Sequence, residues 1–98
     1  MDRYQANKIT SDFLAVYKPL FRYCNGSWWA WDVDHYHWDW MDAKGRMGDA
    51  LMTVTRDLFP DNVKIQNQVA RPYIQEQLIR AMRPHLMNVV LSQNPFSQ

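Results

Sequence analysis

The spacing of hydrophobic residues changes period twice along the chain, and this change predicts an α+β fold. Residues 13–20 carry hydrophobic side chains at helical spacing, residues 21–40 alternate as strands do, and residues 43–91 return to helical spacing. We therefore expect an N-terminal helix, a three-stranded antiparallel β-meander and then about three helices. At 98 residues, the chain is expected to form a single domain over 1–98, with 1–7 and 92–98 as flexible tails.

The N-terminal helix is expected to begin at Thr10 or Ser11, because either side chain can cap its first turn. Pro19 is expected to end it, since the residue before a proline resists helical geometry. Its hydrophobic side is expected to comprise Phe13, Leu14, Val16, Tyr17 and Leu20.

Residues 21–40 predict short strands joined by tight turns. Asn25-Gly26 is a strong hairpin signal, since both residues tolerate positive φ. The expected strands are 21–24, 27–32 and 37–40, and the expected turns are Asn25-Gly26 and 33–36.

All five tryptophans lie in this segment. Because side chains alternate along a strand, Trp29 and Trp31 share one face of the second strand and Trp28 lies on the other. Trp38 and Trp40 share a face of the third strand. A sheet of three strands cannot cover five indoles on one face, so we expect two or three to be buried and the others accessible.

Three helices are expected after the meander. Asp42 is expected to cap the first, Asp61 or Asn62 the second, and Pro72 suits the first turn of the third. Pro84 is expected to break or kink that last helix, with a further turn or two over 86–91. One apolar stripe at helical spacing defines the first of these helices, Val63, Ile65 and Val69 mark the second, and a buried stripe is expected on the third. The stripe of the first comprises Ala43, Met47, Ala50, Leu51, Val54 and Leu58, and that of the third comprises Ile74, Leu78, Ala81 and Met82.

Composition narrows the class of protein. Cys24 is the only cysteine, so neither an internal disulfide nor a cysteine zinc site is expected. The N-terminus lacks the pattern of a signal peptide, and no apolar run reaches the roughly 20 residues that cross a bilayer. We expect a complete small protein of the cytoplasm, the host's if the chain is phage-encoded, with no membrane partner.

The net charge of +1 is unevenly distributed. Residues 1–61 carry seven lysines and arginines against nine aspartates. Residues 62–98 carry Lys64, Arg71, Arg80 and Arg83 against Glu76 alone. This asymmetry permits an anionic partner, but dedicated DNA-binding domains are usually far more basic.

The run 32–39 has some features of a metal site, because His35 and His37 point the same way on a strand with aspartates beside them. Zinc and iron sites usually take a further ligand from elsewhere in the chain, and the remaining histidine is His85. A solvated polar turn is therefore the favoured interpretation, with no metal ligand and no cofactor. Cys24 is expected to be a small core residue, and no catalytic residue is predicted.

The tryptophan cluster has two interpretations. The rings can form the core of a small domain, or some can be exposed to stack on bases or to anchor a protein partner. Basic residues flank the cluster, which suits stacking combined with phosphate contact. The predicted binding residues are Arg22, Trp28, Trp29, Trp31, Trp38, Trp40, Lys44 and Arg46.

Residues 12–59 resemble the small domain that precedes the superfamily-three helicase module of phage and plasmid primase-helicases. The shared pattern is a helix, then Arg22-Tyr23, then the tryptophan strand 28–32, then His37-Trp38-Asp39, then the helix 43–59. The helicase itself would carry a phosphate-binding loop, which this sequence lacks, so ATPase activity does not transfer. The resemblance implies an accessory role in the replication of mobile-element DNA.

The predicted function is that of a non-enzymatic phage or mobile-element binding module, accessory to DNA replication. It would contact single-stranded DNA or a replication protein through the Trp-rich hairpin. The alternative is a small phage-encoded inhibitor of a host enzyme or defence complex, similar to anti-CRISPR proteins, that acts by protein–protein binding. Two further alternatives stay open: a homodimer that covers the aromatic patch, and a metal-dependent enzyme that uses His35 and His37.

Overall fold

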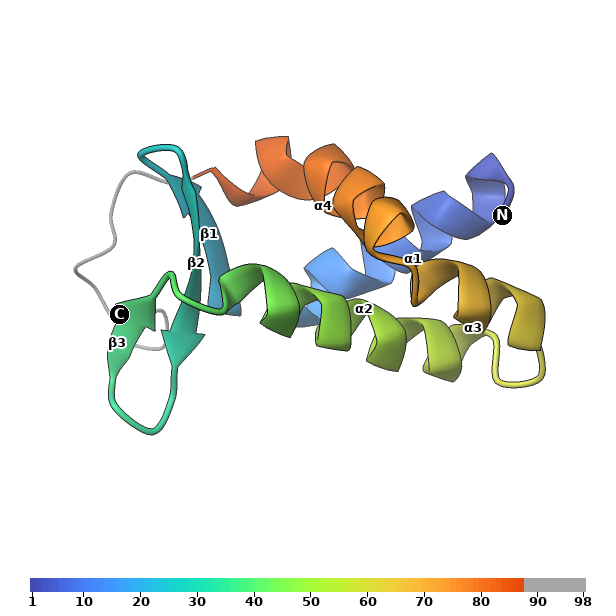
Figure 1. The fold of residues 1–98 in the computed structure, drawn as a ribbon, viewed down its shortest axis with the longest axis horizontal. Helices are drawn as coiled ribbons and strands as arrows, with labels where there is room; N and C mark the ends of the chain where they lie inside the picture. The colour runs from blue at the N-terminus through green and yellow to red at the C-terminus, as the bar shows by residue number, and fades with distance from the viewer. Residues whose placement is uncertain (88–98) are drawn as a thin grey trace.

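The computed structural model of the chain describes residues 1–87 and confirms the α+β fold (Figure 1). The elements are α1 (Arg3–Tyr17), the 3₁₀ helix η1 (Lys18–Leu20), β1 (Phe21–Cys24), β2 (Ser27–Asp32), β3 (His37–Asp39), α2 (Ala43–Leu58), α3 (Val63–Val69) and α4 (Pro72–Leu86). Most of the turn predicted over 86–91, from residue 88 onward, and the tail predicted over 92–98 lie outside the described residues.

The sheet stands at one end of the molecule, and the helices extend from one of its faces (Figure 1). Its strand order is β1-β2-β3, with both neighbouring pairs antiparallel. Phe21 pairs with Ala30 and Tyr23 pairs with Trp28, so these four side chains share the face turned toward the helices. The opposite face of the sheet is referred to below as the outer face.

The start of α1 differs from the prediction. Asp2 is the N-cap, its Oδ1 accepts the Gln5 N–H at 2.8 Å, and the Gln5 side chain accepts the Asp2 N–H at 3.0 Å. This reciprocal capping box stabilises a start well before Thr10, so the predicted tail over 1–7 is wrong from Arg3 onward. Val16, expected on the hydrophobic side of this helix, is exposed, whereas Ile9 and Phe13 are buried.

The two turns of the meander are confirmed, with one change at the end. Asn25 and Gly26 both have positive φ, 54° and 78°, as a tight hairpin turn requires. β3 ends at Asp39, so Trp40 is not a strand residue and does not share a face with Trp38. The Asp39 side chain accepts the Met41 N–H at 2.9 Å, which turns the chain out of the sheet at this point.

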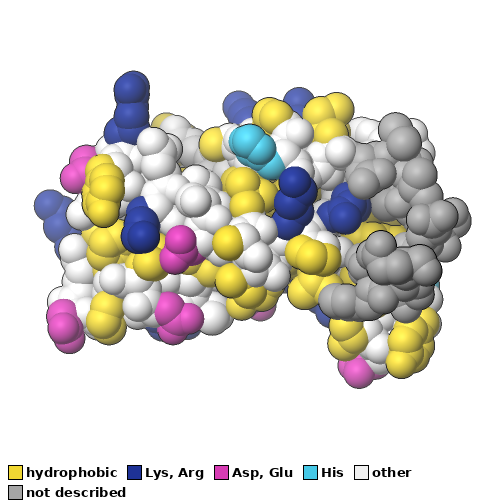
Figure 2. Space-filling view, turned by 180° about the vertical axis from the view of Figure 1, so that it is seen from behind, with side chains coloured by type: hydrophobic (Ala, Val, Ile, Leu, Met, Phe, Trp, Pro, Cys, Tyr) yellow, Lys and Arg dark blue, Asp and Glu magenta, His cyan; other side chains and the backbone are white. Residues whose placement is uncertain are grey.

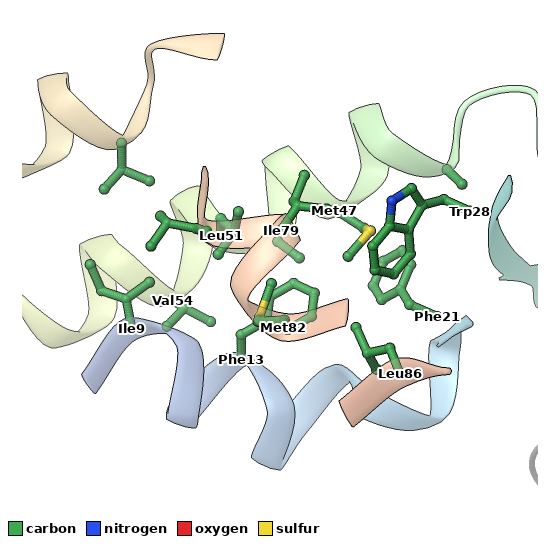
Figure 3. Packing of buried hydrophobic residues seen from close by; sticks show 14 of the residues in the cluster. Ile9, Phe13, Phe21, Trp28, Met47, Leu51, Val54, Ile79, Met82 and Leu86 are labelled. Carbon is green, nitrogen blue, oxygen red and sulfur yellow. The ribbon is translucent and has the colours of Figure 1, made fainter. Parts of the chain in front are cut away.

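The hydrophobic core lies between the inner sheet face and the helices (Figure 3). Ile9 and Phe13 from α1 and the predicted stripe of α2 pack in it, together with α4 residues such as Met82. Phe21 stacks on Phe13 with ring centroids 5.6 Å apart, and the Trp28 indole projects from β2 toward Met47. These contacts attach the sheet to the helices.

The caps and breaks of the later helices agree with prediction in part. Asn62 caps α3 by accepting the Ile65 N–H at 3.0 Å, whereas Asp42 stands at the N-cap of α2 without a side-chain cap hydrogen bond. Of the two outcomes predicted at Pro84, a break or a kink, the break is wrong, because α4 continues to Leu86. The carbonyl that loses its partner there belongs to Arg80, which is exposed on the helix surface.

Packing between α2 and α4 accounts for two details of burial. Gly48 is buried, and a Cβ at this position would stand 2.4 Å from the Gln75 side chain of α4. The Gln75 side chain therefore occupies the space that a larger residue at this position would take. Ala81, predicted to be buried, is exposed, because the buried side of α4 is formed by residues such as Leu78 and Met82.

Replacing Trp28 tests whether the indole holds the sheet on the helices. We expect Trp28→Ala to lower the free energy of unfolding by about 3–5 kcal/mol, because it removes a large buried ring and leaves a cavity. Trp40→Ala, the same change at an exposed ring of the same segment, is expected to alter it by about 0.5 kcal/mol or less. Urea unfolding followed by circular dichroism measures both, and equal losses would contradict the assigned role.

Candidate functional site

Three surfaces of the sheet carry the candidate chemistry. They are the outer face with Arg22, Trp29, Trp31 and Trp38; a groove lined by Tyr23, Gly26, Ser27, Trp28, Trp40, Met41, Lys44 and Arg83; and the Asp–His cluster of Asp32, His35 and His37. The groove lies at the β1–β2 turn, and the Asp–His cluster lies at the opposite end of the sheet, around the β2–β3 turn.

On the outer face, strand register places the side chains in a row. Arg22 pairs with Trp29 and Trp31 pairs with Trp38 across the strands. The Trp31 and Trp38 rings meet edge to face at 5.5 Å, and the Arg22 guanidinium carbon lies 5.7 Å from the Trp38 ring centroid. Edge-to-face and cation–π contacts of this kind stabilise the row.

Several predicted binding residues are used within the fold. Trp28 and Trp31 are only 7% and 6% exposed, and the Trp29 indole N–H donates to the Cys24 carbonyl at 3.1 Å. Arg22 donates to the carbonyls of Lys18 and Phe21, and burial lowers its pKa. The expectation that two or three indoles are buried is confirmed, although the two buried rings belong to opposite faces of β2.

The predicted basic residues do not converge. Lys44 lines the groove, but Arg46 lines a separate pocket of about 280 Å³ beside Trp31 and the start of α2, and Arg22 lies on the outer face. Cys24 is half-buried and pairs with Ser27, so its side chain lies on the outer face and not in the core as predicted.

The groove, of about 410 Å³, brings aromatic rings and cations together. Trp40 is 61% exposed, and Met41 beside it is also exposed. Arg83 lies over the Tyr23 ring, with its guanidinium carbon 4.6 Å from the centroid, and donates to the Tyr23 hydroxyl at 3.4 Å. The Tyr23 ring in turn meets Trp28 edge to face at 5.0 Å, which connects the groove to the core.

Sequence reasoning could have placed one of the groove residues, Tyr23, but not another, Arg83. The Asn25-Gly26 turn sets Tyr23 opposite Trp28, so hairpin register alone could have placed Tyr23 beside the predicted cluster. No sequence signal connects Arg83 of α4 with Trp40, because only the packing of α4 against the sheet brings them to one groove.

The Asp–His cluster is built by the β2–β3 turn. Asp32 Oδ1 accepts the backbone N–H groups of Asp34 and His35 at 3.0 and 3.2 Å, and Oδ2 lies 2.9 Å from His35 Nδ1 and 3.9 Å from His37 Nε2. The hydrogen bond from His35 lowers the pKa of the Asp32 carboxyl, and the same bond raises the pKa of His35. Within residues 1–87, this cluster is where side chains of metal-ligand type converge, with one ligand atom from each residue within 4.8 Å of the others.

Comparison with known proteins gives no match: no family model, no curated protein and no solved structure is significantly similar to this chain. The resemblance of residues 12–59 to the primase-helicase domain therefore stays a prediction. None of the helices among residues 1–87 combines the length and the apolar character needed to cross a bilayer.

Tyr36 allows a test of the β2–β3 turn. Its φ is 54°, in the left-handed region that costs a non-glycine residue about 1–2 kcal/mol, and its side chain is exposed. We expect Tyr36→Gly to raise the free energy of unfolding by about 1 kcal/mol, measured by urea denaturation.

Val33→Gly is the control, since Val33 is exposed in the same turn without a positive φ. We expect it to lower the free energy of unfolding by about 0.4–1 kcal/mol, because glycine increases the entropy of the unfolded chain. A Tyr36→Gly variant that is destabilised as much as Val33→Gly would show that Tyr36 is not strained.

Proposed function

We propose that this chain is a non-enzymatic binding module that holds a short segment of single-stranded DNA in the groove. The observation that carries the proposal is the convergence of exposed Trp40 with Lys44 and Arg83. An exposed aromatic ring supplies a stacking platform for a base of any sequence, and cations beside it neutralise the phosphates. The wider role, accessory to the replication of mobile-element DNA, rests on the resemblance of residues 12–59.

The cations of the groove have partners within the protein but can still bind phosphate. Lys44 Nζ lies 3.2 Å from both carboxylate oxygens of Glu76, and both side chains are partly exposed. An exposed pair of this kind contributes only about 0–1 kcal/mol, so a phosphate can compete for the ammonium. The hydrogen bond to Tyr23 uses one of the five N–H donors of Arg83, which leaves the others for an anionic ligand.

The electrostatic contribution is expected to be modest. Lysine and arginine side chains are scattered among hydrophobic and acidic ones on the face shown in Figure 2, and they form no continuous basic belt there. The net charge of +1 agrees with this picture. Stacking on Trp40 should therefore carry a larger share of the affinity than phosphate contact.

A protein partner, as a host-directed inhibitor would need, is the second candidate. Met41 is 78% exposed next to Trp40, and a pair of exposed large apolar side chains suits a protein anchor better than a nucleic acid. The pairing of Lys44 with Glu76 also lowers the net positive charge of the groove. The same residues would serve either ligand, so binding experiments decide between them.

Trp40→Leu tests the stacking platform. Fluorescence anisotropy of a labelled oligothymidylate at low salt should show saturable binding to the native chain. We expect Trp40→Leu to weaken this binding by about 1–3 kcal/mol, roughly five- to 150-fold, because one base loses its stacking partner. Tyr4→Leu, a change at another exposed aromatic ring, on α1, should leave the affinity unchanged. No binding by the native chain would exclude single-stranded DNA and favour a protein partner.

Arg83→Gln tests the phosphate contact. For two phosphate contacts, from Lys44 and Arg83, the slope of log K against log salt should be about −1.4, and removal of one contact should bring it to about −0.7. Arg56→Gln removes an equal charge from the exposed surface of α2, outside the groove, and should keep the native slope. Equal slopes for the native chain and Arg83→Gln would remove Arg83 from the binding site.

A further inference from the structure

The Asp–His cluster contains three donors of the kind that bind divalent transition metals. Asp32 lies on β2 and pairs in register with His37 on β3, and His35 comes from the turn between them. A pair of imidazole nitrogens with one carboxylate oxygen is a common ligand set for zinc and for non-haem iron. The turn is exposed to solvent, as the sequence predicts, and it also supplies the third side chain of metal-ligand type.

The ring of His37 is already oriented as a ligand. Its Nδ1 lies 3.1 Å from the Trp38 carbonyl oxygen, which can only accept, so Nδ1 carries the proton in the neutral ring. Nε2 then presents its lone pair on the side of the ring that faces Asp32 Oδ2, 3.9 Å away. Metal-bound histidines almost always donate their second nitrogen in this way, which sets both the tautomer and the ring orientation.

The two carboxylate oxygens of Asp32 have different partners. Oδ1 accepts the N–H groups of Asp34 and His35 and is held by the turn, while Oδ2 faces the two imidazoles. The Tyr36 N–H donates to the Asp32 carbonyl at 2.8 Å and closes the turn. The position of Oδ2 is thus determined by backbone hydrogen bonds before any ion binds.

We propose that Asp32, His35 and His37 bind one Zn²⁺ ion, or another borderline divalent metal of similar size. Bonds of about 2.0–2.1 Å at a tetrahedral centre place neighbouring ligand atoms about 3.3 Å apart. The distances from Asp32 Oδ2, 2.9 Å to His35 and 3.9 Å to His37, lie on either side of this value. All three ligand atoms lie within 4.8 Å of one another, so ring rotations that shorten the longer separations toward the tetrahedral value would complete the site.

Metal binding displaces a proton from His35 Nδ1 and leaves one coordination position for another ligand. The metal takes the place of the proton that His35 Nδ1 shares with Asp32. A neutral ring moves this proton through solvent to Nε2, and a protonated ring releases it to solvent, so that His35 binds as a neutral imidazole in both cases. Three protein ligands leave the fourth tetrahedral position to water. The side chains of His35 and His37 are 73% and 54% exposed, so this position is open to solvent or to a group from a partner.

Isothermal titration calorimetry of the full chain with zinc chloride tests the site. We expect one Zn²⁺ per chain, with the affinity reduced at least about tenfold by His37→Gln and by His35→Gln, since each removes one ligand. His85→Gln is the matched control: His85 is the third histidine of the chain, exposed on α4, and its loss should leave the affinity unchanged. Circular dichroism of each variant verifies that it folds.

A second measurement reads the coordination directly. Co²⁺ in place of Zn²⁺ should give visible absorption bands in the native chain and in His85→Gln, and these bands should weaken in His37→Gln and His35→Gln. Absence of zinc binding to the native chain would overturn the proposal. Binding that His85→Gln abolishes, or that persists unchanged in folded His37→Gln, would place the metal elsewhere and overturn it as well.

Discussion

Burial of the Trp28 indole between the sheet and the helices is the interaction on which the rest of the structure depends. Three short strands are not stable in water unless one face is covered. Trp28, Phe21 and Ala30 provide an apolar inner face, and Phe13 of α1 and Met47 of α2 cover it. Because this contact orients the meander relative to α2 and α4, it also determines which surface residues meet.

The groove follows directly from that docking. Tyr23 meets Trp28 edge to face and also contacts the Arg83 guanidinium, so one ring connects the core to a surface cation. Trp40 can stay exposed because β3 ends before it and the Asp39 side chain turns the chain toward α2. A buried and an exposed indole of one short segment thus have separate roles, one in stability and one in the proposed binding.

The two ends of the sheet differ in chemistry because their turns differ. Asn25-Gly26 adopts positive φ at little cost, and the groove beside it combines aromatic rings with Lys44 and Arg83. The β2–β3 turn contains Tyr36 in the same left-handed region, where a bulky residue is unfavourable, and it gathers Asp32 and two histidines. Turn geometry, and not burial, therefore brings the proposed metal ligands together.

The sequence by itself determined the features that depend on neighbours in the chain. Strand alternation, the Asn25-Gly26 turn and the hydrophobic stripe of α2 are local properties of the backbone, and they were predicted correctly. The early start of α1 is also encoded locally, in the capping box of Asp2 and Gln5. The prediction missed it because the hydrophobic residues that predict the helix begin later in the chain. The strand predicted over 37–40 extends beyond the end of β3 for a similar reason. An aromatic pattern does not reveal where the hydrogen bonding of a strand stops.

Only the tertiary structure decided which of the predicted binding residues are accessible and which act together. Alternation assigns Trp28 and Trp31 to opposite faces, yet both are buried, because exposure depends on what packs against each face. Arg46 and Lys44 are close in sequence and line different pockets, whereas Arg83 and Trp40 are distant and line the same groove. Periodicity describes directions around one element, and the meeting of elements far apart in sequence depends on how their buried faces fit together.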